Sequence, residues 1–584
     1  MNQFFKFLIA SILGVFISLL ILIFIGIGMI SSVGQKEKVT IKPNSILELR
    51  LNYPITERSA NDGLGELELP GFPKMAGLGL NDILQNIEKA KTDENIKGIY
   101  LNISIVSAGF AQCKEIRNKL TEFKTAGKFV LAYSEVYTQK AYYLASVADK
   151  IYLNPAGMFE FVGLSANYTF YKNALDKLGI EPQIIKVGTF KSAVEPYILD
   201  KMSEPSKLQT REYLGDIYSQ FLTDIGESRN LPSTQLHSYA NNLEITGPGA
   251  AADKGLVDYL TYEDQVDDTL KIMSGVIGKL NLVKISKYNK VPAPIEKLEK
   301  NKIAVIYASG AIMSGSGENE TIGSVTMVKA IKDAHEDDNV KAIVLRINSP
   351  GGSALASEVI WRELMLAKAK KPVIASMSSV AASGGYYIAC AADYIIALPN
   401  TITGSIGVFG VIPNTKKFFN DKVGITFDGV KTADHADMIS LTRPMTPEER
   451  AFMQTNVNHT YDIFTQRVAD ARGISQADVK LIGEGRVYSG SKALEINLVD
   501  ELGGIKEAIV MAAKKAGIEN FRIKELPVQK DALEEILSQL SQASIKAPLA
   551  KLIGEKATEE LKTLKEFSQM SGIQARLPYS ISIN

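Results

Sequence analysis

Residues 89–103, KAKTDENIKGIYLNI, recur at residues 333–347 as DAHEDDNVKAIVLRI, aligned without a gap at an offset of 244 residues. The same offset aligns AYYLASVADKIYLNP at 141–155 with GYYIACAADYIIALP at 385–399. One offset that holds across two separate blocks is hard to obtain by chance, and self-similarity of this kind indicates a repeated architecture. The sequence therefore predicts a tandem duplication.

Each copy alternates short β-rich runs with amphipathic helical stretches. The expected strands lie at 96–103, 129–134 and 150–154 in the first copy and at 340–347, 372–377 and 394–398 in the second. Helical stretches such as 111–123 and 356–369 lie between the first and second strands of each set. Because strands that alternate with helices favour parallel sheets, the fold class is expected to be α/β.

The length of 584 residues allows several domains. We expect five segments: an anchor and linker at 1–45, the first copy at 46–200, a mostly helical connection at 201–300, the second copy at 301–524 and a helical tail at 525–584. Within the tail, the charged run from Asp531 to Met570 fits a solvated amphipathic helix better than an interaction helix.

The N-terminus carries a long apolar run. Residues 7–33, FLIASILGVFISLLILIFIGIGMISSV, contain no charge, and the run is longer than the roughly 20 residues needed to cross a bilayer. A cleaved signal peptide has a shorter apolar core, so we expect an uncleaved transmembrane helix. Basic residues flank the run on both sides, which leaves its orientation open.

Composition argues against several other classes of function. The chain has 65 basic and 65 acidic residues, without the basic excess expected of a nucleic-acid-binding surface. Its four histidines and two cysteines are scattered, and no spacing resembles a metal or haem site. We therefore expect no nucleic acid partner, no metal and no cofactor.

The two copies differ where chemistry is expected. The second copy has INSPGGSALAS at 347–357, whose Gly-Gly turn can present amides to an anion, and the first copy has Ser-Ala opposite those glycines. The second copy also has Ser383 directly before a Gly-Gly pair and a helical run, where the first copy has Gln-Lys-Ala. Ser383 is a candidate nucleophile. Alternatively, its side chain serves only to cap the N-terminus of the helix that follows.

A serine nucleophile needs a base, and none stands nearby on the N-terminal side of Ser383. Lys191 in the first copy lies opposite His435 in the second. A lysine in partly apolar surroundings can lose its proton and act as a general base. The local sequence of Lys191 by itself favours an ordinary surface lysine. His435, with Asp434 beside it, is a rival base in a Ser/His/Asp arrangement. These residues alone leave both possibilities open.

Four motifs, INSPGGS, SVAASGGYYIA, TGSIGVFG and VGTFKSAVEPY, resemble the signal peptide peptidase A family, also called protease IV, in its long duplicated form. The similarity runs from the N-terminal anchor to about residue 520. It implies a fold of the crotonase/Clp-protease type, built from repeated ββα units, and a serine peptidase that works without a metal or cofactor. The family degrades signal peptides that remain in the membrane after cleavage.

The resemblance also implies a role for each matching residue. The implied roles are nucleophile for Ser383, general base for Lys191, orientation of the lysine amine for Ser405, and oxyanion-hole amides for Gly352 and Gly384. His435 would then have no catalytic role. The nucleophile comes from the second copy and the base from the first.

The family further implies partners and a location. Its members assemble as homotetramers with the active sites facing an enclosed cavity, and their substrates are hydrophobic signal-peptide fragments. The resemblance implies a single-pass protein of the bacterial inner (cytoplasmic) membrane, held in the bilayer by residues 7–33. The catalytic body would lie on the extracytoplasmic, periplasmic side.

Two alternatives come from other classes. A crotonase-like enzyme that acts on acyl-CoA would use a similar oxyanion hole, but it has no use for a serine paired with a distant lysine. An inactive membrane-tethered scaffold of the same fold is the second alternative, and intact Ser383, Lys191 and Gly352 argue against it.

Overall fold

The predicted duplication appears as two sheets that share a parallel core of six strands in the same order. The sheet of the second copy also carries β15, parallel to β13, and β17, antiparallel to β15. The computed structural model describes residues 6–7, 13–18, 40–59, 77–292, 299–317, 321–529 and 573–577. In the first copy the order is β6-β4-β3-β2-β1-β7, and in the second the equivalent path is β18-β14-β13-β11-β8-β19. Every pairing along both paths is parallel. The α/β class and the tandem duplication are confirmed.

The first copy begins with regular strand–helix alternation. Its elements are β1 (Ser45–Leu49), α2 (Leu80–Thr92), β2 (Ile96–Asn102), α3 (Phe110–Lys124), β3 (Phe129–Tyr137), α4 (Gln139–Ala145) and β4 (Lys150–Phe159). The three strands expected at 96–103, 129–134 and 150–154 are confirmed as β2, β3 and β4.

The chain continues through a short strand and a series of helices. They are α5 (Lys172–Leu178), β5 (Glu181–Lys186), the 3₁₀ turn η1 (Ser192–Val194), α6 (Glu195–Ile198), α7 (Glu204–Arg229), α8 (Ser233–Asn241), α9 (Pro248–Asp253), β6 (Tyr259–Leu260), α10 (Glu263–Ser274), β7 (Leu282–Lys284) and α11 (Ile285–Tyr288). Residues 201–300, expected as a mostly helical connection, thus contain five helices and also the two outer strands of the first sheet within the described residues.

The second copy repeats this pattern with additions near the site. Its elements are β8 (Lys302–Ser309), β9 (Ala311–Met313), β10 (Thr321–Gly323), α12 (Ser324–Glu336), β11 (Val340–Ser349), β12 (Gly351–Ser353), α13 (Ala354–Lys368), β13 (Val373–Ala382), α14 (Gly384–Ala389), β14 (Tyr394–Ala397), β15 (Ile402–Gly404), β16 (Phe409–Asn414), the π-helical turn η2 (Phe418–Val423), α15 (Pro447–Arg472), α16 (Gln476–Ile482), β17 (Val487–Ser489), α17 (Gly490–Glu495), β18 (Glu501–Leu502), α18 (Ile505–Ala516), β19 (Arg522–Leu526) and β20 (Ile573–Arg576).

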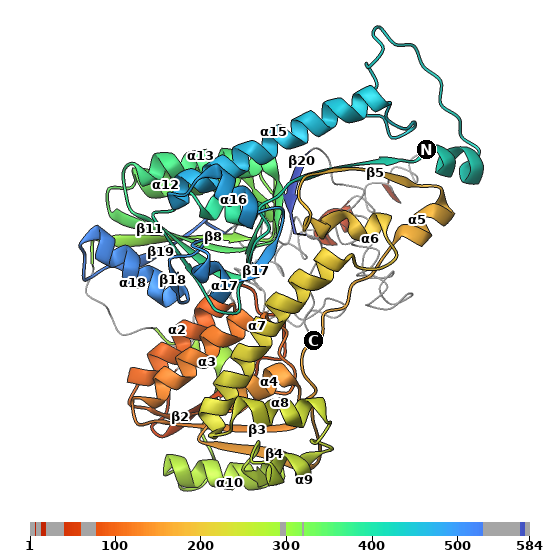
Figure 1. Ribbon diagram of the computed structural model, residues 1–584. Helices are drawn as coiled ribbons and strands as arrows, with labels where there is room; N and C mark the ends of the chain where they lie inside the picture. The colour runs from red at the N-terminus through yellow and green to blue at the C-terminus, as the bar shows by residue number, and fades with distance from the viewer. Residues whose placement is uncertain are drawn as a thin grey trace.

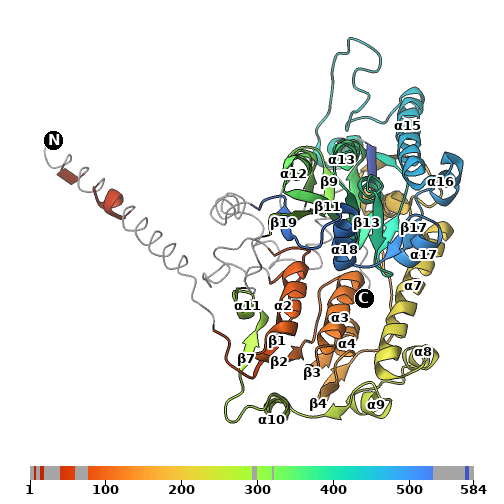
Figure 2. The same cartoon turned by 90° about the vertical axis from the view of Figure 1, so that its left-hand side faces the viewer.

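The two sheets stack with helices between them. Figure 1 shows, from bottom to top, α10, the sheet of the first copy, helices α2 and α3, the sheet of the second copy, and helices α12 and α13. Figure 2 shows α2 and α3 between the two sheets from the side. Helix α3 of the first copy packs on β3 of its own sheet and on β13 of the second sheet, which joins the two copies into one structure.

A buried ionic network joins the copies across this layer. Arg346 on β11 is fully buried, and its Nε donates to Glu57 Oε2 at 2.7 Å. Its Nη2 donates to Glu115 on α3, and its Nη1 donates to Ser376 Oγ at 3.0 Å. Because a buried charge is costly without partners, the two carboxylates from the first copy fix where the second copy sits.

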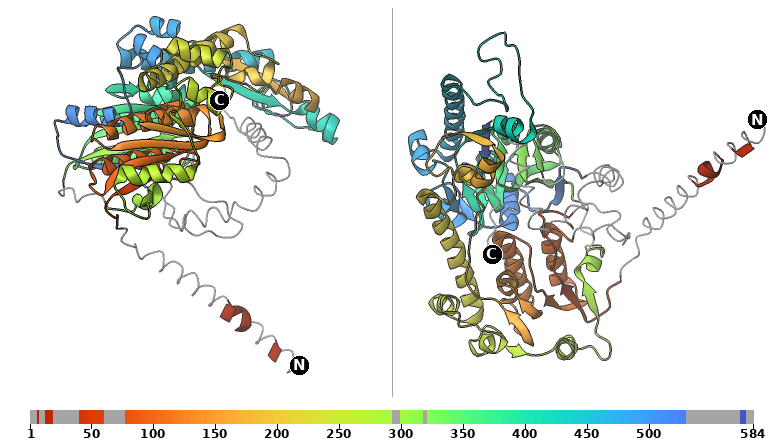
Figure 3. Two further views of the ribbon diagram at one scale, coloured as in Figure 1. Left: turned by 90° about the horizontal axis from the view of Figure 1, so that it is seen from below. Right: turned by 90° about the vertical axis from the view of Figure 1, so that its right-hand side faces the viewer.

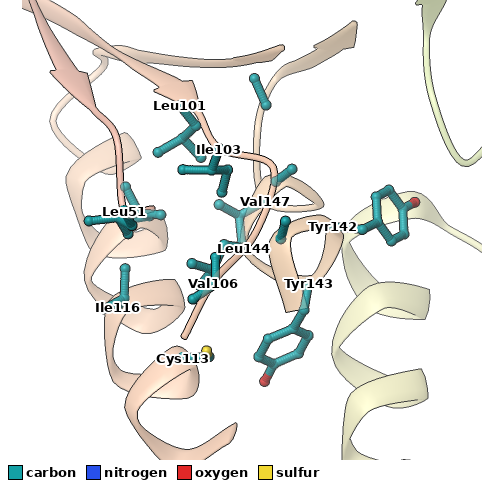
Figure 4. Packing of buried hydrophobic residues seen from close by; sticks show 14 of the residues in the cluster. Leu51, Leu101, Ile103, Val106, Cys113, Ile116, Tyr142, Tyr143, Leu144 and Val147 are labelled. Carbon is teal, nitrogen blue, oxygen red and sulfur yellow. The ribbon is translucent and has the colours of Figure 1, made fainter. Parts of the chain in front are cut away.

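Apolar side chains fill the space between the sheet and helices of the first copy. Figure 4 shows Leu101 of β2 and Ile103 just after it on the same side as Ile116 of α3 and Leu144 of α4, and the rings of Tyr142 and Tyr143 near α7. Each fully buried Leu or Ile side chain contributes about 1.5–3 kcal/mol relative to an exposed one. This core holds the helices that support the loops of the site.

A third sheet, of mixed direction, is built from both copies. Its strand order is β10-β9-β12-β20-β16-β5. Strand β5 of the first copy pairs antiparallel with β16 of the second, from Lys186 opposite Phe409 to Glu181 opposite Asn414. Figure 3 shows α5 and α6 of the first copy beside this part of the second copy in both views. The pairing places the loop after β5 against the second copy.

Two sequence expectations fall mostly outside the described residues. Most of the expected membrane anchor at 7–33 lies there, as does the charged run from Asp531 to Met570. Within the part of the chain that is described, no helix combines the length and the apolar character required to cross a bilayer.

Candidate active site

Ser383 occupies a strained turn between β13 and α14. Its backbone has φ +55° and ψ −114°, a region that residues other than glycine enter at a cost of about 1–3 kcal/mol. The turn is held from the neighbouring strand, because the Ser383 amide donates to Gly404 O at 2.8 Å. Ser383 stands at the N-cap position of α14, but its hydroxyl makes no capping hydrogen bond. The N-cap interpretation therefore does not account for this side chain.

Lys191 reaches Ser383 from the first copy. It follows β5 and directly precedes η1, and the pairing of β5 with β16 carries it into the second copy. The Nζ atom of Lys191 lies 2.8 Å from Ser383 Oγ. Both side chains are fully buried, so Lys191 is not the ordinary surface lysine that its local sequence allowed.

The loop that carries Lys191 packs backbone to backbone on a loop of the second copy. The Phe190 amide donates to Glu484 O at 3.0 Å. Gly485 has φ +78°, and a Cβ atom on it would lie 2.7 Å from the Lys191 Cα. A residue with a side chain would push Lys191 away from Ser383, so the close approach of the two copies depends on this glycine.

Gln209 on α7 bridges the same two loops. Its Nε2 donates to Phe190 O at 3.2 Å and to Ser192 Oγ at 2.9 Å, and its Oε1 accepts from the Val487 amide at 3.0 Å. The side chain is buried and its contacts flank Lys191 on both sides. The sequence analysis did not find Gln209, because a glutamine within a long amphipathic helix carries no local signal of its own.

Ser405 is the third side chain at the dyad. The Lys191 Nζ lies 3.0 Å from Ser405 Oγ and 3.3 Å from Ser405 O. A neutral amine has two N–H groups and one lone pair. The two contacts with Ser405 can take both N–H groups, which leaves the lone pair for the Ser383 hydroxyl. The geometry suits the orienting role that the family resemblance implies for Ser405, and that role stays a prediction.

Burial controls the protonation of Lys191. Removal from water lowers the pKa of the Lys191 amine well below its ordinary value of 10.5. No carboxylate contributes to this shift in the described part of the chain, so nothing there holds the ammonium form against the effect of burial. The amine is thus neutral over a wider pH range than an exposed lysine, and the neutral form can accept a proton.

The glycines expected to form the oxyanion hole lie beside Ser383. Gly384 is the first residue of α14, and Gly352 lies in β12. A Cβ atom on Gly351 would lie 2.6 Å from the Gly384 N, which shows how closely the Gly-Gly turn approaches the Ser383 turn. The structure brings both segments to the dyad, and the role of the two amides stays a prediction.

His435, the rival base, faces elsewhere. It lies in the loop between η2 and α15, and its side chain is 55% exposed. Its Nδ1 lies 3.2 Å from Glu449 Oε1, and Asp434 beside it is exposed. The Ser/His/Asp alternative is therefore wrong for this geometry, because the Ser383 hydroxyl contacts the Lys191 amine at 2.8 Å and donates to Gly407 O at 3.4 Å, whereas His435 contacts Glu449.

The arrangement is suited to nucleophilic catalysis. A buried amine with a lowered pKa touches a serine hydroxyl on a strained turn, and glycine-rich backbone lies next to that hydroxyl. Across the described residues, no cluster of three or more histidine, cysteine or acidic side chains is arranged to hold a metal ion.

Comparison with known proteins shows which family this chain resembles in sequence. The profile of peptidase family S49 matches residues 122–276 and again 365–519, and the Clp protease profile matches residues 298–403. "Protease 4" of Haemophilus influenzae is 33% identical over 94% of both chains. "Protease 4" of Salmonella typhi is 36% identical over 94% of this chain and 90% of the relative. "Serine protease SPPA, chloroplastic" of Arabidopsis thaliana is 33% identical over 86% of this chain and 74% of the relative.

Proposed function

Because this chain belongs to peptidase family S49 and is a serine peptidase with a Clp-protease-like fold, we propose that it is a membrane-anchored endopeptidase that degrades cleaved signal peptides. In this proposal Ser383 is the nucleophile and Lys191 is the general base. The observation that carries the proposal is the contact of 2.8 Å between Lys191 Nζ and Ser383 Oγ, buried between the two copies.

The proposed reaction follows from the positions of these groups. Neutral Lys191 takes the proton of Ser383 as Oγ attacks the scissile carbonyl. The amides of Gly352 and Gly384 hold the oxyanion, a contribution of about 3 kcal/mol per donor. The protonated lysine gives its proton to the leaving amine, and water activated by the same lysine then hydrolyses the acyl-enzyme.

The apolar N-terminal run supports the membrane part of the proposal. Residues 7–33 carry no charge, and a run of that length is suited to cross a bilayer. An enzyme held there meets peptides that remain in the membrane, and the motifs shared with the signal peptide peptidase A family point to the same substrates. We place the anchor in the bacterial inner membrane and the catalytic body on its periplasmic side.

A homotetramer is part of the same proposal, on the strength of the family resemblance alone. Light scattering of the detergent-solubilised full chain measures the assembly directly. A mass of four chains of 63.7 kDa each is expected, and a monomer would contradict it.

The substrate proposal is tested with the full chain in lipid vesicles that contain a synthetic signal peptide. Mass spectrometry should show internal cleavage of the peptide, and Ser383→Ala should abolish it. A folded water-soluble protein in the same vesicles should stay intact. Cleavage that persists in Ser383→Ala would show that Ser383 is not the nucleophile. An enzyme that cleaves other peptides but leaves signal peptides intact would refute the proposed substrate.

A further inference from the structure

A buried carboxylate of the first copy contacts both strands that lead to the site in the second copy. Glu57 lies between β1 and α2, and its side chain is buried. Its Oε1 accepts from Asn348 Nδ2 of β11 at 3.0 Å and from the Ser378 hydroxyl of β13. Its Oε2 accepts from Arg346 Nε at 2.7 Å. One side chain of the first copy therefore ties β11 to β13.

The two strands are irregular at the point where Glu57 meets them. The register of β11 against β13 shifts here, so that residues 378–380 of β13 lie opposite Asn348 alone. The Asn348 side chain supports this β-bulge, because its Oδ1 accepts from the Val380 amide at 3.2 Å. A bulge next to an active site changes the direction of the residues that follow it, and Ser383 comes three residues after Val380.

Both strands end at groups of the site. Strand β13 ends at Ala382, directly before Ser383, and β11 ends at Ser349, directly before the loop that carries Gly352. Ser349 Oγ accepts from the Gly351 amide at 3.1 Å, which fixes that loop to the end of β11. The spacing of the two strand ends therefore sets the position of the Ser383 turn relative to the glycine loop.

The first copy holds Glu57 itself in place. The Ile55 amide donates to Ser107 O at 2.9 Å, and the Asn81 amide donates to Glu57 O at 3.2 Å. Gln112 Nε2 on α3 donates to Glu57 Oε1 at 2.9 Å and to Ile55 O at 3.1 Å. The carboxylate thus accepts four hydrogen bonds, one from its own copy and three from the second.

We propose that Glu57 is a positioning residue of the peptidase, which holds the bulge of β13 and thereby aligns Ser383 with Gly352. The proposal rests on the proposed function, in which Ser383 is the nucleophile and the Gly352 amide holds the oxyanion. The first copy then serves the catalytic centre twice. It supplies the base, Lys191, and through Glu57 it aligns the groups that the second copy carries.

Glu57→Gln tests the proposal with little change in side-chain shape. The new NH₂ group replaces an acceptor and faces a donor, so at least one of the four hydrogen bonds is lost. We expect kcat for peptide hydrolysis to fall about 10–100-fold with KM little changed. The kcat is expressed per site that a fluorophosphonate labels at completion, so that unfolded protein is not counted. Inhibition by a peptide boronic acid, which forms a tetrahedral adduct with serine, should weaken in parallel.

Glu115→Gln is the matched control. Glu115 is also buried and also binds Arg346, but within the described residues it has no hydrogen bond to Asn348 or Ser378. Its kcat per site should stay close to that of the parent. Asn348→Ala breaks the link from the second copy and leaves both carboxylates on Arg346, so it should reproduce the loss of kcat even if Glu57→Gln fails to fold. A parental kcat per site in Asn348→Ala, or equal losses in the two Glu→Gln variants, would overturn the proposal.

Hydrogen exchange of residues 377–385 measures the support without catalysis. Amides of this segment should exchange about tenfold faster in Glu57→Gln than in the parent, and no faster in Glu115→Gln. If the parent hydrolyses no peptide, the peptidase function is refuted, and the exchange still decides whether Glu57 holds the Ser383 turn. Unchanged exchange together with normal hydrolysis would overturn the proposal and leave the peptidase function intact.

Discussion

Lys191 Nζ of the first copy lies 2.8 Å from Ser383 Oγ of the second, and both side chains are fully buried. Neither copy holds both groups, so the duplicated chain divides one catalytic centre between its halves. Strand β5, the Gly485 loop and Gln209 hold the two halves in register at this point.

Ser405 should matter for the rate of the chemical step more than for substrate binding. Its Oγ lies 3.0 Å from Lys191 Nζ, and loss of this contact frees the amine to turn away from Ser383. Ser405 has φ +50°, so Ser405→Gly removes the hydroxyl without adding backbone strain. We expect kcat to fall about 10–100-fold with little change in KM, measured by steady-state peptide hydrolysis. A raised KM with an intact kcat would show that Ser405 contacts the substrate instead.

The pH dependence of activity should follow the protonation of Lys191. Burial lowers the pKa of this amine well below 10.5, and only the neutral amine can accept the serine proton. Therefore kcat/KM should rise with pH through the lowered pKa and then level off well before pH 10.5. A profile that stays flat down to about pH 4 would be inconsistent with a lysine base, because burial alone does not shift a lysine that far below the documented range of about 5–6.

The burial of Lys191 should also make the free energy of unfolding depend on pH. Between the lowered pKa of Lys191 and its ordinary value of 10.5, the unfolded chain binds a proton at this residue that the folded chain does not. Stability contributed by the group therefore rises with pH across that window. Lys191→Met removes the titration, so its Tm should equal or exceed that of the parent at pH 7. The difference should shrink as the pH approaches 10. A constant difference, or a lower Tm at pH 7, would contradict a buried neutral lysine.

Gln209 should act as a positioning residue. Gln209→Leu removes the hydrogen bonds to Phe190 O, Ser192 Oγ and the Val487 amide, so the loop that carries Lys191 loses its connection to β17. We expect kcat to fall about 10–100-fold, since small displacements of a catalytic group are costly. Gln220→Leu on the same helix is the control, because Gln220 contacts only Asp224 among the described hydrogen bonds. Equal effects of the two variants would point to a general loss of helix packing.

Much of this structure could be predicted from internal repetition. The matching blocks at 89–103 and 333–347 give the strands β2 and β11 in register, because the buried apolar pattern of a parallel strand is local. Comparison of the two copies leaves Lys191 and His435 both as candidate bases, and the family resemblance favours Lys191. The residues carry no local signal of the contact, which forms when β5 joins β16.

The remaining parts depend on tertiary contacts that leave no pattern in the chain. Gln209 is one polar residue in a long helix, and its partners are distant in sequence. Strand β20 is four residues long, too short for a periodic signal, and it exists as a strand because β12 and β16 pair with it. Both features belong to the site, and both require the folded structure to be seen.

The most direct test compares kcat/KM for peptide hydrolysis by Lys191→Ala and His435→Ala in the full chain. The account predicts a loss of at least about 10³-fold for Lys191→Ala, because Ser383 is left without a base, and a change of less than about twofold for His435→Ala. His435 is exposed and contacts Glu449, so its removal leaves the dyad intact. An active Lys191→Ala enzyme together with an inactive His435→Ala enzyme would contradict the division of the catalytic centre between the two copies.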